Sequence, residues 1–144
     1  KGHSASGFEV LDIERLKTTF DVNSLGALRV IQAVMPNMKK GSQKIVANMS
    51  SRMGSIHEST GGAIGYRASK TALNSFTKSL SIEFSDQNFI FVVLHPGWVR
   101  TDMTSDNATY STDESAEALF TVITGLSQTD NGQFYDLHGK SIAW

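Results

Sequence analysis

The sequence predicts an α/β fold in which short buried strands alternate with longer helices. Two short apolar runs, residues 44–49 and 89–94, are rich in β-branched residues and are typical of buried strands. Around them, apolar residues recur at the three- and four-residue spacing of helices. The connections are too long for hairpins. We therefore expect the strands to pair in parallel through helical crossovers.

The first helix is expected to begin after Asp12, whose carboxylate can cap the free backbone N–H groups of its first turn. The preceding residues, 1–11, are mixed in character and contain Gly and Ser, which predicts a loop. The helical spacing continues until Pro36 and Gly41, which mark its end. Weak helix formers lie in the middle of this stretch, so we expect a local bend at Asn23.

The remaining elements follow from the same periodicities and from turn-forming residues. After the strand at 44–49, the expected elements are a Ser-, Gly- and Thr-rich loop at 50–62, a helix from Ala63 to about Phe84, the strand at 89–94, a break at His95-Pro96-Gly97, a polar loop or lid at 98–112, a helix from Asp113 to Leu126, a short strand from Gln133 to Asp136 and a closing turn from Asp136 to Gly139.

Composition and charge exclude several classes of function. With 144 residues, 40% of them hydrophobic, the chain can bury a core. Its 13 basic and 14 acidic residues argue against a basic face for nucleic acid and against a polybasic membrane anchor. The absence of Cys excludes disulfides, thiolate metal sites and Cys nucleophiles, and the four scattered His residues do not suggest a metal site. Without a membrane-length apolar run or a leader, the chain is expected to be cytoplasmic and to bind neither membrane nor nucleic acid.

The segment Tyr66-Arg67-Ala68-Ser69-Lys70 carries the most chemical information. Tyr66 and Lys70 are four residues apart near the start of an expected helix, so they project from one face. A nearby ammonium favours the phenolate and lowers the pKa of a phenol, so the pair could exchange a proton with an alcohol or a carbonyl. The alternative is an ordinary helix surface with Tyr66 half-buried and Lys70 solvated. In either case Arg67 is expected to face away and to be solvated.

The context of this pair favours a functional site. Ser50 and Ser51 follow the first expected strand, and Pro96-Gly97 follows the next. In open parallel sheets, ligands bind beyond the carboxyl ends of the strands. The serines, the tyrosine–lysine pair and the Pro-Gly break therefore converge on one rim, where a Ser hydroxyl could bind a substrate oxygen.

Four motifs, in this order and spacing, resemble those of the short-chain dehydrogenase/reductase family. The residues that carry the resemblance are Asn23 in Val-Asn-Ser-Leu-Gly, Asn48-Met-Ser-Ser51, Tyr66-Arg-Ala-Ser-Lys70 and Pro96-Gly-Trp-Val-Arg-Thr101. The resemblance covers essentially the whole chain. Finer details look like the sniffer-type carbonyl reductases and C-factor-like proteins, namely Leu94 to Met103 and the ending Gly139 to Trp144.

The resemblance implies a fold class: the C-terminal part of a Rossmann-type doubly wound parallel sheet, with three αβα layers. Residues 1–144 would form a single partial domain, the catalytic half. The family's Gly-rich turn and the residue that selects between NAD and NADP have no counterpart in the chain. We therefore expect a fragment of a longer enzyme, lacking the N-terminal dinucleotide-binding strands.

The resemblance also implies roles for individual residues. Tyr66 matches the general acid/base, and Lys70 matches the residue that lowers the pKa of the tyrosine and holds the nicotinamide ribose. Asn23 matches the asparagine that supports a water-mediated proton relay to the lysine. The implied cofactor contacts are Tyr66 and Lys70 together with Pro96, Gly97, Val99 and Thr101.

Ser51 matches the serine that orients the substrate carbonyl. We prefer it to Ser50 because Gly54 follows three residues later, as in the family's Ser-x-x-Gly pattern. The separation between Ser51 and Tyr66 is about two residues longer than the commonest family spacing. The loop at 50–62 can absorb this difference at a small cost in entropy.

The resulting hypothesis is an NAD(P)-dependent oxidoreductase that interconverts a small-molecule carbonyl and an alcohol. The subfamily resemblance favours NADP(H) over NAD(H). Broad apolar faces on the helices around Asn23 and Tyr66 allow a homo-oligomer. The alternative is a truncated, non-catalytic half-domain that acts through binding or is inactive, because the chain lacks a pyrophosphate site. The strand at 44–49 would then present an unpaired edge.

Overall fold

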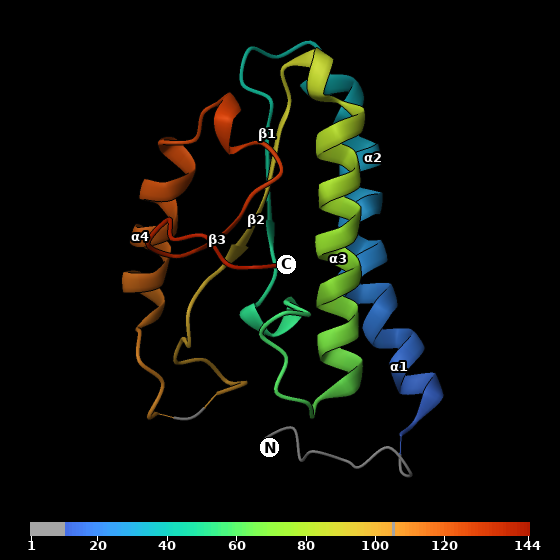
Figure 1. Ribbon diagram of the computed structural model, residues 1–144, viewed down its shortest axis with the longest axis vertical. Helices are drawn as coiled ribbons and strands as arrows, with labels where there is room; N and C mark the ends of the chain where they lie inside the picture. Colours follow the sequence, from blue (N-terminus) through green and yellow to red (C-terminus); the bar gives the residue numbers. More distant parts are fainter. Residues whose placement is uncertain (1–10, 105) are drawn as a thin grey trace.

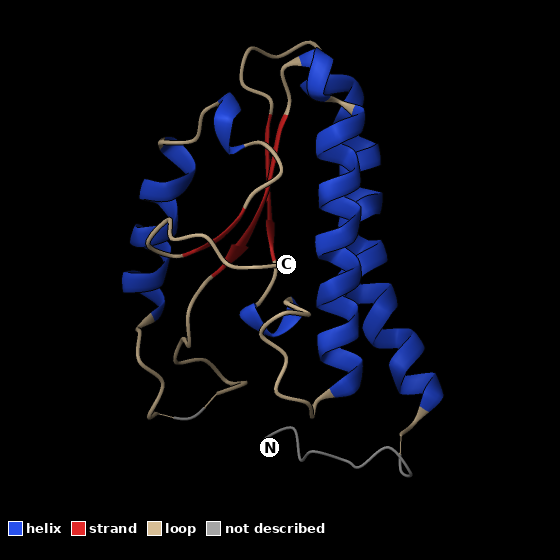
Figure 2. Cartoon of the chain, in the orientation of Figure 1, coloured by secondary structure: helices blue, strands red, loops and turns tan. Residues whose placement is uncertain are grey.

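The computed structural model describes residues 11–104 and 106–144, which form three layers (Figures 1 and 2). A sheet with strand order β1-β2-β3 lies between long helices on one side and a shorter helix on the other. In chain order the elements are α1 (Ile13–Phe20), a π-helical turn (Asp21–Leu25), α2 (Gly26–Met38), β1 (Ile45–Met49), a 3₁₀ turn (Arg52–Gly54), α3 (Ile64–Glu83), a 3₁₀ turn (Ser85–Gln87), β2 (Ile90–His95), α4 (Thr112–Thr124), a 3₁₀ turn (Gln128–Asp130) and β3 (Phe134–Asp136).

Both strand pairs are parallel, which confirms the predicted fold class. Met49 at the end of β1 pairs with Leu94 on β2, and His95 at the end of β2 pairs with Asp136 on β3. The carboxyl ends of the strands therefore meet at one edge of the sheet. Within the described residues, β1 has a strand neighbour on one side only.

β2 is the centre of the core because helices cover both of its faces. Val92 and Leu94 pack with Leu119 of α4 on one face, and Phe91 packs with Phe89 on the other. Successive side chains of a strand point to opposite faces, so an uninterrupted apolar run suits a strand that is buried on both. α2 and α3 lie together on the face opposite α4 (Figure 1).

The expected first helix is two helices joined by a π-helical turn. The Asp12 carboxylate caps α1 as predicted, accepting from the backbone N–H groups of Glu14 (3.0 Å) and Arg15 (3.1 Å). The predicted irregularity at Asn23 is confirmed and takes the form of this turn. Pro36, however, does not end the helix, because α2 continues to Met38. Proline lacks a backbone N–H and so removes one hydrogen bond from the helix. Near the C-terminus of the helix, the last turn can still close without that bond.

Other predicted boundaries shift by a few residues. The helix expected to begin at Asp113 begins at Thr112, because Ser111 caps it in a reciprocal pair of hydrogen bonds with Glu114. It ends at Thr124 rather than at Leu126. The loop predicted at 1–11 lies, apart from its last residue, outside the described residues. No helix of the described part is long and apolar enough to cross a membrane.

Tyr135 on β3 gives a test of the fold at alkaline pH. Its hydroxyl donates to Asp130 Oδ1 at 2.7 Å, and burial together with this carboxylate raises the pKa of Tyr135 to about 12 from 10.0. Because the folded-state pKa is the higher one, the associated stability is fully present below pH 10 and is lost as pH rises toward 12. We expect denaturant unfolding to show this loss in the native chain and a smaller one in Tyr135→Phe. Ionisation of Tyr135 with the midpoint of an unfolded tyrosine, followed by ultraviolet absorbance, would contradict the prediction.

Candidate active site

The carboxyl ends of β1 and β2 and the first turns of α3 lie together, as the motif positions predicted. The backbone N–H of Ser50 donates to Leu94 O at 2.8 Å, which joins the two strand ends. The Lys70 ammonium donates to Met49 O at 3.1 Å, which joins α3 to the end of β1. The sheet edge and the helix are thus held in contact by hydrogen bonds.

Tyr66 and Lys70 share one face of α3 and are half-buried. Lys70 Nζ lies 5.9 Å from the centroid of the Tyr66 ring. Burial lowers the pKa of Lys70 from its ordinary value. An ammonium carries three donors, and the Met49 carbonyl takes one of them. The ammonium therefore lies near the Tyr66 ring and has donors left for further oxygen atoms.

The two serines after β1 differ in what their hydroxyls bind. Ser50 Oγ donates to Asn74 Oδ1 at 2.6 Å, so this hydroxyl is used in holding β1 against α3. Ser51 Oγ accepts from the backbone N–H of Met53 at 3.2 Å, as the cap of the 3₁₀ turn. That bond does not use the hydroxyl hydrogen of Ser51. Ser51 is therefore the serine whose O–H can be offered to a substrate.

Gly54 explains the Ser-x-x-Gly spacing. Its backbone N–H donates to Ser51 O at 2.8 Å and closes the 3₁₀ turn. A Cβ at this position would lie only 3.0 Å from Lys70 Cβ and from Asn74 Nδ2. The turn that carries Ser51 can approach α3 this closely only because residue 54 has no side chain.

Asn23 reaches α3 through Ser69 rather than directly through Lys70. Its amide nitrogen donates to Ser69 Oγ at 3.0 Å, and Ser24 Oγ donates to Ser69 O at 2.7 Å. Ser69 Oγ in turn donates to Tyr66 O at 2.8 Å. π-Helical turns recur at functional sites, and this one directs two neighbouring side chains at the residue before Lys70.

The break after β2 depends on Pro96 and Gly97. Pro96 O accepts from Ser115 Oγ of α4 at 2.7 Å, which fixes the start of the segment. Gly97 has a φ of 84°, and a Cβ there would lie 2.8 Å from the Tyr110 ring. A residue with a side chain would be strained in its backbone and would also collide with that ring.

The predicted lid is a loop that returns to its own start. Val99 forms an isolated parallel bridge with Tyr110, and Tyr110 N donates to Trp98 O at 3.1 Å. Thr101 lies in the exposed part of the loop, where its Oγ1 accepts from Met103 N at 3.3 Å. The Pro96–Thr101 segment thus leaves the end of β2 beside Ser50 and Ser51.

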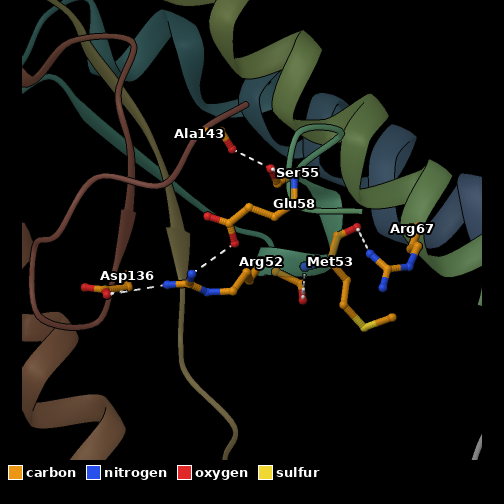
Figure 3. A network of polar contacts seen from close by, with 8 residues as sticks. Arg52, Met53, Ser55, Glu58, Arg67, Asp136 and Ala143 are labelled. Atoms are coloured by element: carbon orange, nitrogen blue, oxygen red, sulfur yellow. Dashed lines mark hydrogen bonds and ion pairs between the residues drawn. The ribbon is translucent and has the colours of Figure 1, made fainter. Parts of the chain in front are cut away.

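A network around Arg52 was not predicted from the sequence (Figure 3). Its guanidinium lies between Glu58 on its own loop and Asp136 on β3. Only the register of the sheet could have indicated this, because it places Asp136 beside the end of β2.

Arg67 was expected to be solvated. This is wrong in part, because its guanidinium donates to Gly61 O, Met53 O and Thr60 Oγ1.

The donor set at this edge fits the nicotinamide and ribose end of a dinucleotide. The Lys70 ammonium, which gives one donor to Met49 O, has further donors for ribose hydroxyls. The sequence contains no Gly-rich turn of the kind that holds a pyrophosphate. Among the described residues, no cluster of three or more His, Asp or Glu could hold a metal ion.

The amino-acid sequence matches known proteins over most of its length. The sequence model of a family described as short chain dehydrogenase matches residues 2–111. The chain is 41% identical over 135 residues to C-signal of Myxococcus xanthus, a match that covers 93% of this chain and 81% of that protein. It is 34% identical to 1-hydroxy-2-glutathionyl-2-methyl-3-butene dehydrogenase of Rhodococcus sp. strain AD45, covering 93% of this chain and 61% of that protein.

Solved structures show the same arrangement of elements. Carbonyl reductase Sniffer of D. melanogaster aligns with a TM-score of 0.94 at 33% identity, over 100% of this chain and 63% of that chain. An NADPH-bound carbonyl reductase from chicken fatty liver aligns with a TM-score of 0.88 at 32% identity, over 98% of this chain and 62% of that chain. The chain therefore spans about three fifths of the length of these structures, with the fold of the corresponding part of their Rossmann-type domains.

Proposed function

The chain belongs to the short chain dehydrogenase family, and we propose that it takes part in the NAD(P)-dependent interconversion of a carbonyl and an alcohol. The observation that carries the proposal is the position of the Lys70 ammonium. It lies between the carbonyl at the end of β1 and the ring of Tyr66, next to the turn that presents Ser51. Because several relatives are considerably longer, the activity of the whole protein is part of this proposal.

The cofactor, when bound, supplies or accepts the hydride. Lys70 would hold the ribose hydroxyls, and the backbone of Pro96, Gly97, Val99 and Thr101 would lie along the nicotinamide. We favour NADP(H), because several of the similar structures are described with NADPH or NADP bound, among them the chicken carbonyl reductase and a carbonyl reductase from Pseudomonas aeruginosa.

The chain's own residues would control the oxygen and the proton. The Ser51 hydroxyl would donate a hydrogen bond to the substrate oxygen and hold it in place. The Tyr66 hydroxyl would give a proton to that oxygen in the reductive direction and take one back in the oxidative direction. The Lys70 cation stabilises the negative charge that then develops on the phenol oxygen. Asn23 would support return of the proton through water.

One observation also supports a non-catalytic alternative, in which the chain acts by binding another protein. Within the described residues β1 is an edge strand, and its last residue, Met49, is 42% exposed. An exposed strand edge can pair with another chain. Cofactor binding separates this alternative from the enzymatic proposal.

A titration with NADPH, and separately with NADH, tests the proposed function. We expect nicotinamide fluorescence to change saturably with NADPH, and more weakly with NADH. Lys70→Gln should weaken binding, because the ribose loses its cationic donor. Lys17→Gln removes an exposed ion pair on α1 instead and should bind as the native chain does. If the folded protein binds neither nucleotide, the chain is a catalytic half without its coenzyme platform, and the enzymatic proposal is wrong for this chain by itself.

A further inference from the structure

The segment that carries Ser51 is held from two sides. From α3, Thr71 Oγ1 donates to Gly54 O at 2.9 Å. From the C-terminal side, Ala143 O accepts from Ser55 Oγ at 2.6 Å (Figure 3). Residues 51–58 therefore bridge α3 and the C-terminal part of the chain, and contacts on either side can change where Ser51 lies.

Arg52 makes the charged part of this bridge. Its Nη1 lies 3.0 Å from Glu58 Oε2, and its Nη2 lies 3.7 Å from Asp136 Oδ2. The other carboxylate oxygen of Asp136 accepts from the backbone N–H groups of His138 (2.9 Å) and Lys140 (3.0 Å). Asp136 thus closes the turn after β3 with one oxygen and faces Arg52 with the other. Its side chain is only 13% exposed, so the cation counters a carboxylate that is largely removed from water.

His95 places the end of β2 in the same cluster. It is the sheet partner of Asp136 and immediately precedes Pro96. Its Nδ1 is buried without a hydrogen-bond partner among the described residues. Burial lowers the pKa of His95, and the Arg52 charge lowers it further, whereas the Asp136 and Glu58 carboxylates raise it. The charges of Arg52, Asp136 and Glu58 therefore lie around the end of β2, which leads into residues 96–101, the segment proposed to lie along the nicotinamide.

We propose that Arg52 is a positioning residue that fixes Ser51 relative to the end of β2, by bridging Glu58 and Asp136. A guanidinium is suited to this role because its planar fork directs N–H groups at two carboxylates in a fixed geometry, whereas the donors of an ammonium are carried on a flexible stem. Without the cation, the two carboxylates would repel each other and the loop would lose its charged link to β3. The structural part of the proposal stands independently of catalysis, and only its kinetic consequence rests on the proposed function.

Amide hydrogen exchange and NMR titration of His95 test the positioning without any activity assay. In Arg52→Gln we expect faster exchange at the amides of Gly54 and Ser55, which close the turn onto Ser51 and Arg52. We also expect the His95 pKa to rise, because a nearby positive charge is lost. Asp136→Asn should speed the same exchange but lower the His95 pKa.

Two further variants separate the fork of Arg52 from its charge and from general effects. Arg52→Lys keeps the charge, so the His95 titration should stay near the native one while the exchange rates lie between those of the native chain and Arg52→Gln. Lys17→Gln removes an exposed ion pair on α1 and should change neither measurement. Arg52→Lys and Asp136→Asn also provide the test if Arg52→Gln does not fold.

Kinetics then connect the position of Ser51 to turnover. In Arg52→Gln we expect kcat for carbonyl reduction to fall about tenfold, since small misplacements of a group that orients the substrate are costly. The KM for the nucleotide should stay unchanged, because Arg52 is not among the residues proposed to contact it. Native exchange rates and a native His95 pKa in Arg52→Gln would overturn the inference about Arg52. The expected exchange and pKa changes in a protein that reduces no carbonyl would instead overturn the proposed function and leave the positioning role standing.

Discussion

Tyr66→Phe is expected to lower the turnover of a carbonyl substrate by roughly 10²- to 10⁴-fold, the usual contribution of a positioned acid or base. The substitution removes only the phenol oxygen, which is the proton donor in the proposed reaction. The ring, which lies 5.9 Å from Lys70 Nζ, remains in place. We therefore expect circular dichroism and the unfolding midpoint to stay close to those of the native chain, so that the loss of turnover does not come from a loss of folding.

A matched control removes a tyrosine hydroxyl elsewhere. Tyr135→Phe deletes the hydroxyl that binds Asp130, beside β3 and away from Lys70. It should cost about 1 kcal/mol of stability at neutral pH and leave kcat unchanged. Turnover of Tyr66→Phe within a few-fold of the native rate would remove Tyr66 from the proposed mechanism.

Phe91→Ala is expected to have the largest effect on stability, about 3–5 kcal/mol. Phe91, the second residue of β2, is 0% exposed. Its ring centroid lies 5.7 Å from that of Phe89 and 5.9 Å from that of Phe84. The substitution would remove one of three rings that all contact one another, and the surrounding residues could fill the resulting space only partially.

Phe120→Ala is the control for this substitution, because Phe120 on α4 is 69% exposed. Its effect should stay within about 0.5 kcal/mol, as is usual for surface positions. Urea unfolding followed by circular dichroism measures both variants. Equal destabilisation by the two substitutions would contradict the assignment of the core to β2.

Most elements of the fold could be predicted because their signals are local. The run at 89–94 is apolar at every position, as a strand covered on both faces requires, and it forms all of β2 except the last residue, His95. Asp12 caps α1 because a carboxylate two residues from a free backbone N–H can reach it in almost any setting. Element boundaries were less predictable. Pro36 stayed inside α2 because packing of the neighbouring residues against β2 outweighs one missing hydrogen bond.

Within the candidate site, spacing predicted which side chains share a face but not what each one binds. The four-residue separation of Tyr66 and Lys70 was sufficient to place both on one face of α3. The difference between Ser50, which binds Asn74, and Ser51, which caps the next turn, arises from the way α3 lies on β1. The roles of these residues in catalysis remain predictions for the experiments above.

The sequence by itself determined the alternation of strands and helices, the bend at Asn23 and the collection of polar motifs at strand ends. Each of these depends on residues that are neighbours along the chain, so periodicity and capping reveal them. Only the tertiary structure decided that Arg52 lies between Glu58 and Asp136. Asp136 is 84 positions after Arg52 in the sequence. The two meet because parallel pairing of β2 with β3 brings His95 and Asp136 side by side at the edge where the Ser51 loop begins. Contacts between distant segments are set by sheet register and helix packing, which no local pattern encodes.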